Sequence, residues 1–192
     1  MKRLFIAVPL GAPIRREISG IISGDEKLRR MPVRWTAETN LHLTLQFLGD
    51  VEEKRIPKLQ AILDSIMLSQ DPGSLQITKA GTFPNKNNPS ILWLGFAENP
   101  ALPQIRAQLD SALAKNSFET DGKPFKAHLT VGRVQRDRQL PREDYLYFED
   151  RFTQTPLSES PLDRVTLFES RLRPGGPIYT GIYEKVLRAQ ND

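Results

Sequence analysis

One tripeptide, His-Leu-Thr, occurs twice in this chain and constrains its fold more than any other feature of the sequence. It lies at residues 42–44 in the segment LHLTLQFLG and at residues 128–130 in the segment KAHLTVGR. Both segments alternate apolar and polar residues, as a half-buried strand does. The two triplets are 86 residues apart, which favours two pseudo-equivalent halves over a solenoid of short repeats.

The remaining secondary structure follows from apolar spacing and from Gly and Pro breaks. Helices are predicted at residues 13–30, 52–68 and 102–115, where apolar residues recur at three- and four-residue intervals. Strands are predicted at residues 2–9, 41–48, 75–80, 91–96, 126–134, 164–172 and 178–187. We expect a polar loop at residues 83–89, a charged segment at 135–151, and an antiparallel hairpin formed by the last two strands.

Size, charge and cysteine content narrow the class of protein. A chain of 192 residues suits one domain or two small, closely packed lobes. Its formal charge of +4 fits an anionic partner such as a nucleic acid. The sequence has no cysteine, so disulfides, thiolate nucleophiles and cysteine-based zinc sites are excluded. Residues 2–9 resemble a strand more than a signal peptide, and no apolar run is long enough to cross a bilayer, so we expect a soluble cytoplasmic protein without membrane association.

Strict strand alternation divides the first triplet segment into two faces. Leu41, Leu43, Leu45 and Phe47 are expected to face the core, and His42, Thr44 and Gln46 the opposite side. Two residues advance a strand by roughly 7 Å, so one small ligand can reach both His42 and Thr44. The same alternation pairs His128 with Thr130.

Two imidazoles that face one cleft are suited to acid-base catalysis, since one can be neutral while the other is protonated near neutral pH. Two threonine hydroxyls beside them can donate hydrogen bonds to phosphoryl oxygens. The set fits attack of water on a phosphodiester. The plainer alternative is that each histidine only packs in the sheet or lies on the surface. The argument against this alternative is that both histidines of the chain occupy the first position of the repeated triplet. Two histidines without carboxylates at metal-ligand spacing predict no metal site.

The paired motifs, His42 to Leu45 and His128 to Val131, resemble those of the 2H phosphoesterase superfamily, and within it the bacterial and archaeal RNA 2',3'-cyclic phosphodiesterases, formerly called 2'-5' RNA ligases. The likeness extends over nearly the whole length. It includes the blocks RLFIAVPL, NLHLTLQFLGDV, GTFPN, FKAHLTVGR and LFESRL in that order. The chain departs from the family pattern at Ala127, where proline commonly precedes the second histidine.

The resemblance implies an α+β fold in which residues 1–192 form a single domain of two pseudo-symmetric α/β lobes. Antiparallel sheets would form a central cleft, with one motif in each lobe. It also implies an enzyme that needs no metal and opens the 2',3'-cyclic phosphate of an RNA or oligonucleotide end to a 2'-phosphate. We expect no cofactor and a monomer. By resemblance, His42 is the proton donor and His128 the proton acceptor, while Thr44 and Thr130 hold the phosphoryl oxygens. Two alternatives remain open: a 2'-5' RNA ligase that uses the same site, and a non-catalytic nucleotide- or RNA-binding module.

Further substrate contacts are expected from Arg133, Phe47 and Tyr179. Arg133 matches a family arginine, but strict alternation points it away from His128 unless a bulge or the end of the strand turns it inward. Phe47, Trp35, Phe83 and Tyr179 are candidates for stacking on a nucleobase, with core packing as the alternative for each. A basic rim for the RNA backbone is proposed at Lys126, Arg136, Arg138, Arg171 and Arg173.

Overall fold

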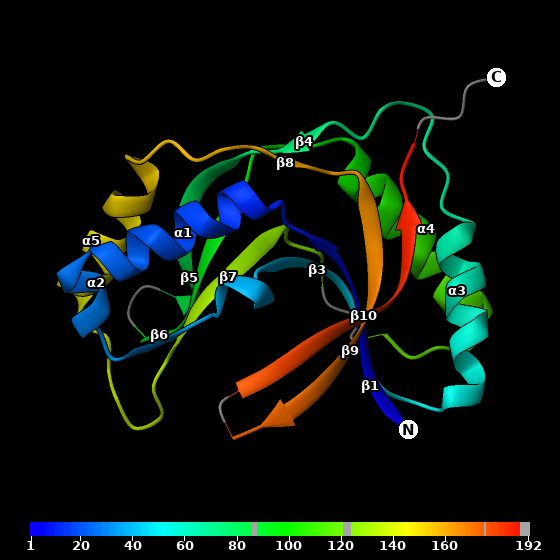
Figure 1. Ribbon diagram of the computed structural model, residues 1–192, viewed down its shortest axis with the longest axis horizontal. Coiled ribbons are helices and arrows are strands. Elements are labelled where there is room, and N and C mark those ends of the chain that lie inside the picture. The colour runs from blue at the N-terminus through cyan, green and yellow to red at the C-terminus, as the bar shows by residue number, and fades with distance from the viewer. Residues whose placement is uncertain (86–87, 121–123, 175, 189–192) are drawn as a thin grey trace.

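Alternating apolar positions build one large antiparallel sheet in the computed structural model, which describes residues 1–85, 88–120, 124–174 and 176–188. Among these residues the sheet has eight strands (Figure 1). Seven of them follow the order β10 (Gly176–Val186), β9 (Arg164–Arg173), β1 (Lys2–Pro9), β3 (His42–Val51), β7 (His128–Val134), β6 (Asn88–Phe96) and β5 (Ile77–Asn85). The eighth, β2 (Val33–Trp35), pairs with β7, and the short strands β4 (Ser74–Leu75) and β8 (Ser160–Pro161) pair with each other.

The sheet consists of two halves that meet at the two triplet strands. We call strands β10, β9, β1 and β3 the His42 half, and strands β7, β6, β5 and β2 the His128 half. Between β3 and β7 the register contains a single residue pair, Leu43 with Leu129. The narrow junction lets the halves diverge on either side of it. The predicted α+β fold with two lobes of antiparallel sheet is confirmed.

Each half carries its own helices. Figure 1 shows α1 (Ala12–Gly24), α2 (Glu26–Arg30) and α5 (Arg142–Thr153) on the side of β5, β6 and β7. Helices α3 (Ile56–Asp64) and α4 (Ala101–Lys115) lie on the opposite side, next to β9 and β10. Two short 3-10 helices, η1 (Glu38–Asn40) and η2 (Glu53–Arg55), precede β3 and α3.

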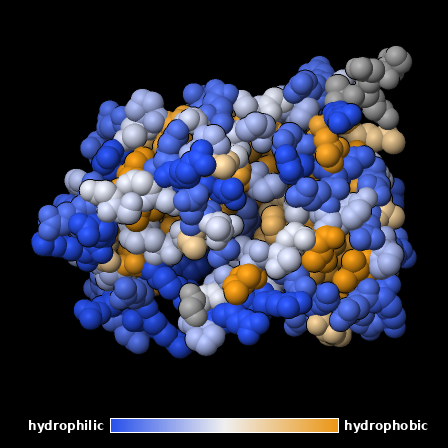
Figure 2. All heavy atoms as spheres, viewed as in Figure 1, coloured by the Kyte–Doolittle hydropathy of each residue, from blue (hydrophilic) through white to orange (hydrophobic). Residues whose placement is uncertain are grey.

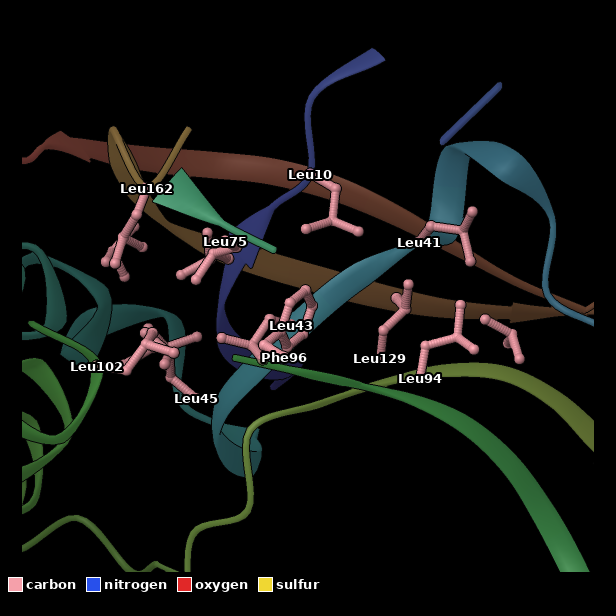
Figure 3. Packing of buried hydrophobic residues seen from close by; sticks show 14 of the residues in the cluster. Leu10, Leu41, Leu43, Leu45, Leu75, Leu94, Phe96, Leu102, Leu129 and Leu162 are labelled. Atoms are coloured by element: carbon pink, nitrogen blue, oxygen red, sulfur yellow. The ribbon is translucent and has the colours of Figure 1, made fainter. Parts of the chain in front are cut away.

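Buried leucine, isoleucine and valine side chains form one continuous core that extends across both halves. At the junction Leu43 and Leu129 are fully buried, and Figure 3 shows them in the same layer as Leu94 and Phe96 of β6. Burial of each such side chain contributes about 1.5–3 kcal/mol. The core therefore fixes the backbone of both triplet strands.

The prediction of one helix at residues 13–30 is wrong, because two helices, α1 and α2, occupy this segment. Helix α1 buries Ile14, Ile18 and Ile22 at four-residue spacing and ends at Gly24. Asp25 then takes an extended conformation, and its carboxylate accepts a hydrogen bond from the backbone N–H of Leu28 at 3.0 Å. This N-cap starts the separate helix α2.

Four other predicted boundaries are corrected. The helix expected at 52–68 is α-helical only over Ile56–Asp64, since Pro57 at its first turn suits a helix start and η2 precedes it. The charged segment expected at 135–151 becomes helical at Arg142, where α5 begins, and α5 extends beyond it to Thr153; the buried residues of α5 are Tyr145, Phe148 and Phe152. The loop expected at 83–89 is largely strand, because β5 continues to Asn85 and β6 begins at Asn88; residues 86 and 87 lie outside the described part. Strand β7 begins at His128 rather than at residue 126.

The C-terminal hairpin is confirmed, because β9 and β10 pair antiparallel along their length. Three residues close to its turn, Arg173, Gly176 and Pro177, line the cleft that is described below. Within the described residues, the helices include none of the length and apolar character that crossing a membrane requires.

Candidate active site

The two triplets open onto one cleft between the halves of the sheet. The cleft has a volume of about 910 Å³, which is large enough for a nucleotide. Its walls include both histidines and both threonines of the motifs. Figure 2 shows hydrophilic side chains together with some hydrophobic ones across the middle of the face that it draws.

His42 is held at the start of β3 by two hydrogen bonds. Its Nδ1 lies 2.7 Å from the carbonyl oxygen of Asn40, and its Nε2 lies 3.0 Å from the hydroxyl oxygen of Thr44. A carbonyl oxygen can only accept, so Nδ1 carries the hydrogen and neutral Nε2 accepts from the Thr44 hydroxyl. The nitrogen that can exchange a proton with a ligand is therefore Nε2.

Aromatic rings surround His42. The Phe5 ring lies with its centroid 4.9 Å away, Phe168 lies 6.2 Å away, and Tyr179 makes an edge contact at 5.2 Å. Burial among them lowers the pKa of His42 to about 4; the hydrogen bond to the Asn40 carbonyl opposes this decrease, and the charge of His128 adds to it. The interaction between the two imidazoles shows that they share one electrostatic environment.

His128 repeats the backbone contact of His42. Its Nδ1 lies 2.6 Å from the carbonyl oxygen of Lys126, two residues before it, just as Asn40 is two residues before His42. Because the carbonyl oxygen can only accept, Nδ1 of His128 carries the hydrogen, and Nε2 is the nitrogen that can exchange a proton with a ligand. Phe83 contacts the ring at 83°, with the centroids 5.1 Å apart. Both histidines thus have the same tautomer and line the same cleft.

A β-bulge in β3 corrects the predicted faces of Gln46 and Phe47. Between Thr44 and Gln46, β3 has one residue more than the opposite stretch of β1, so Leu45 is the extra residue. The bulge reverses the alternation that follows it. Gln46, expected beside His42, is only 1% exposed, whereas Phe47, expected in the core, is 56% exposed and lines the cleft.

The second triplet strand has a bulge at the equivalent position. Between Thr130 and Gly132, β7 has one residue more than β6, so Val131 is the extra residue. Arg133 consequently lies on the same side of β7 as Thr130 and lines the cleft. Strict alternation had placed it on the other side, with a bulge as one of the two ways to turn it inward. Phe47 and Arg133 each follow their histidine by five residues. The two motifs thus present histidine, threonine and a third side chain to the same space.

Tyr179 reaches the cleft from β10 and packs against both His42 and Phe5. Burial raises the pKa of its hydroxyl, and the positive charges of Arg133, Arg3 and Arg34 oppose the increase. These three guanidinium groups therefore act on the same region of the cleft. A concentration of positive charge beside the two histidines suits an anionic ligand.

The basic residues of the cleft differ from the predicted rim. Of that rim, Arg173 lines the cleft, whereas Arg171 forms an ion pair with Glu169 at 2.9 Å. Sequence reasoning missed Arg3 and Arg34. Arg3 could have been found, because it alternates with buried Leu4 and Ile6 along β1 and so shares the cleft face of Phe5.

Asn40 is a third residue that sequence reasoning missed. Its carbonyl holds His42, and its side-chain amide donates to the carbonyl oxygen of Pro177 at 2.8 Å. Asn40 thereby connects strand β10, near the turn of the β9–β10 hairpin, to the first His-Leu-Thr motif. Trp35, a predicted stacking candidate, also lines the cleft, while its indole N–H donates to the carbonyl oxygen of Leu28 at 3.3 Å.

Among the described residues, those that line the cleft include no Asp or Glu. In the part of the chain that the structure describes, no three His, Cys, Asp or Glu side chains are close enough together to hold a metal ion. The functional groups of the cleft are instead imidazole, hydroxyl, guanidinium and aromatic groups. Such groups act by proton transfer, hydrogen bonding and charge.

The model of the LigT-like phosphoesterase family matches this chain twice, at residues 8–93 and 94–179. The chain belongs to this family. The second match begins 86 residues after the first, which is also the spacing of the two histidines. Within the LigT-like phosphoesterases, the chain is 33% identical to the RNA 2',3'-cyclic phosphodiesterase of Thermotoga maritima, over 95% of this chain and 94% of the relative. It is 32% identical to the protein of the same name from Methanocaldococcus jannaschii, over 95% and 99% of the two chains.

Solved structures share this fold. A crystal structure of a Thermus thermophilus protein matches with a TM-score of 0.77 and 25% identity, over 98% of this chain and all of that one. E. coli LigT in complex with 3'-AMP matches with a TM-score of 0.73 and 26% identity, over 97% of this chain and 98% of LigT. The family expected from the paired motifs is confirmed.

Proposed function

We propose that this protein is an RNA 2',3'-cyclic phosphodiesterase, which opens a terminal 2',3'-cyclic phosphate to a 2'-phosphate. The observation that carries the proposal is the matched pair of histidines: each is fixed through Nδ1 by a backbone carbonyl, and both line one cleft with Nε2 available. The relatives named for this activity, and the 3'-AMP complex of E. coli LigT, support it.

In the proposed reaction His128 Nε2 takes a proton from water as the water oxygen bonds to phosphorus. The P–O3' bond breaks, and the departing 3' oxygen receives a proton from His42 Nε2. The phosphate remains on the 2' oxygen. Since one histidine gains a proton and the other loses one, exchange with solvent restores the starting state.

Three side chains are proposed to stabilise the phosphoryl oxygens. Thr130 offers its hydroxyl hydrogen beside His128, Thr44 can offer its own once His42 is protonated and no longer accepts it, and Arg133 offers a forked pair of N–H donors. Arg133 matters most when negative charge builds up on the oxygens during attack, because its planar guanidinium can donate two parallel hydrogen bonds to them. Arg3, Arg34 and Arg173 supply a broader positive field that attracts the RNA end.

The terminal nucleoside is proposed to lie on the His42 side of the cleft. Its 3' oxygen must reach His42, and the exposed ring of Phe47, together with Tyr179 and Ile178, provides apolar surface there. Stacking of a base on such a ring contributes about 1–3 kcal/mol. Phe47 and Tyr179 therefore supply binding energy for the base, whereas the two motifs act on the phosphate.

The first test is the identity of the product. An RNA oligonucleotide ending in a 2',3'-cyclic phosphate is incubated with the protein in a chelating buffer, and the end group is identified by its sensitivity to phosphatase and by ³¹P NMR. We expect a 2'-phosphate and no 3'-phosphate. A 3'-phosphate would contradict the assigned roles of the two histidines, and tight binding without any opening would favour a non-catalytic module.

We further propose that the protein acts as a monomer in the cytoplasm. One chain provides every group that the mechanism uses, so a second subunit is not required to complete the cleft. Light scattering of the active protein, at the concentration used for the assay, tests the monomer.

A further inference from the structure

One arginine outside the cleft contacts the strand that carries His42. Arg106 lies on α4, and its guanidinium donates a hydrogen bond through Nη1 to the backbone carbonyl oxygen of Leu45 on β3. Leu45 follows His42 by three residues. Arg106 is not among the residues that line the cleft, so it makes no contact with a ligand there and has no part in the mechanism proposed above.

Leu45 is the extra residue of the β3 bulge, and the extra residue of a bulge is the one that a strand ladder leaves unpaired. The register of β3 with β1 passes over Leu45, and the register with β7 contains one pair only, at Leu43. Leu45 is 1% exposed, so water does not replace a missing partner. A buried carbonyl without a donor is destabilising. Arg106 supplies this carbonyl with a donor from outside the sheet.

Two neighbours hold the guanidinium of Arg106 in place. Its Nε lies 2.9 and 2.8 Å from the two carboxylate oxygens of Asp110, four residues further along α4. The ring of Phe125 lies with its centroid 5.5 Å from the guanidinium carbon, within the range of a cation–π contact. The Arg106 side chain is only 12% exposed, so solvent screens these contacts weakly. A planar guanidinium can bind Asp110 with Nε and Leu45 with Nη1 at once, which the compact ammonium group of a lysine does less well.

The bulge at Leu45 is the reason that Phe47 faces the cleft. It reverses the alternation that follows, so that Gln46 is buried and Phe47 is 56% exposed. The centroid of the Phe47 ring lies 6.1 Å from that of Phe5, and Phe5 in turn contacts His42. A change in the backbone at Leu45 would therefore shift the ring that we assign to the terminal base.

We infer that Arg106 is a positioning residue, which fixes the bulge through the Leu45 carbonyl and thereby holds Phe47 against the base of the terminal nucleoside. The inference rests on the proposed function, because it uses the placement of the base beside Phe47. Arg106 itself touches neither the base nor the phosphate. Its effect on a ligand must then pass through Phe47, and a thermodynamic cycle between the two residues detects such coupling.

The test is a double-substitution cycle on nucleotide affinity, which needs no turnover. Isothermal titration calorimetry gives the Kd of a 2'-phosphate mononucleotide for the unmodified protein, Phe47→Leu, Arg106→Met and the variant with both substitutions. We expect Phe47→Leu to weaken binding about tenfold, as the loss of one stacking contact does. Arg106→Met should weaken binding about fivefold, because the ring is no longer held toward the base. The double variant should bind about tenfold less tightly than the unmodified protein, rather than about fiftyfold, since Arg106 acts through Phe47.

Two further variants separate positioning from a general effect on the fold. Arg106→Lys keeps a donor for the Leu45 carbonyl and should weaken binding by no more than about twofold. The matched control is Arg55→Met, because Arg55 also lies over a phenylalanine ring, 3.9 Å from the Phe118 centroid, and donates to two backbone carbonyls just beyond α4. Arg55 is not among the residues that line the cleft. Arg55→Met should therefore lower the free energy of unfolding and leave the Kd within about twofold of the unmodified protein.

Kinetics with a cyclic-phosphate-ended oligonucleotide give an independent readout. Arg106→Met should raise KM and leave kcat within about twofold, because Phe47 binds the base equally before and during the reaction. Losses that multiply in the double variant, or an unchanged Kd in Arg106→Met, would show that Arg106 does not position Phe47, and the proposed function would stand. Should Arg106→Met not fold, Arg106→Gln takes its place in the cycle and is judged by the same criterion. If the unmodified protein opens no cyclic phosphate, the proposed function fails, while the cycle still decides the role of Arg106.

Discussion

In the free protein His42 is uncharged, whereas its proposed role as a proton donor requires the protonated ring. Burial among aromatic rings lowers its pKa to about 4, so at neutral pH the ring is uncharged and Nε2 accepts the Thr44 hydroxyl. A proton donor must carry a hydrogen on Nε2. The negative charge of a bound phosphate favours the imidazolium, so substrate binding is what prepares His42 to act as an acid.

We predict that a bound phosphate raises the pKa of His42. NMR titration of the ring should give a midpoint near 4 in the free protein, and a midpoint at least one unit higher with a saturating 2'-phosphate mononucleotide. The chain has two histidines, so the His128→Gln variant assigns the signals; because it also removes the charge of His128, its own midpoint should be higher than in the unmodified protein. A midpoint that stays the same or falls on binding would contradict the acid role.

Among the individual residues of the cleft, the sequence predicted the four motif residues but only some of the residues that contact them. His42, Thr44, His128 and Thr130 were recognisable because the triplet repeats and its alternation is undisturbed. Asn40 was not, since the contact of its side-chain amide with the Pro177 carbonyl joins residues that are 137 positions apart in the chain. Contacts of this length leave no mark in local sequence.

The paired bulges are the feature of the strands that local patterns could not predict. Leu45 and Val131 each follow their histidine by three residues, and each reverses the alternation beyond it. Apolar residues at both positions look like ordinary core residues, because bulged residues need no special composition. A prediction from strict alternation therefore assigned Gln46 and Phe47 to the wrong faces of β3. It could not decide on which face of β7 Arg133 lies.

Gly132 is predicted to be essential to the junction of β2 with the bulged strand. A Cβ atom there would lie 2.5 Å from Cγ1 of Val33 and 3.0 Å from Cε3 of Trp35. We expect Gly132→Ala to lower the free energy of unfolding by about 1–3 kcal/mol, since the core must move to accept the methyl group. Urea unfolding measures the change, and weaker nucleotide binding should accompany it because Trp35 lines the cleft.

Gly20→Ala is the matched control for that variant. Gly20 lies on an exposed part of α1 with no atom within 4 Å of an added Cβ. Alanine should therefore raise the free energy of unfolding by about 0.5–1 kcal/mol, because it favours the helix. Equal destabilisation by both substitutions would show that the clash at Gly132 is not the cause.

Each half of the molecule is assembled from distant parts of the chain. The His42 half joins β1 and β3 to β9 and β10, while the strands of the His128 half lie between them in sequence. The sequence predicted two pseudo-equivalent halves from the repeated triplet. It could not predict that the C-terminal hairpin returns to the first half, because strand order depends on packing across the whole molecule.

We propose that this interleaving makes residues 1–192 a single cooperative domain. The one core extends through both halves, so neither can unfold without exposing the other. We expect one thermal transition, with equal calorimetric and van't Hoff enthalpies. Two separated transitions would show that the lobes are independent domains.

The convergence of two imidazoles on one phosphorus is tested most directly by the rate of opening in histidine variants. A cyclic-phosphate-ended oligonucleotide is followed under single-turnover conditions with the unmodified protein, His42→Ala, His128→Ala and the double variant. Each single substitution should slow opening by about 100-fold or more, and the double should be much less impaired than the product of the two losses, because both groups act in one displacement. Undiminished opening by either single variant, with its fold intact, would contradict this mechanism.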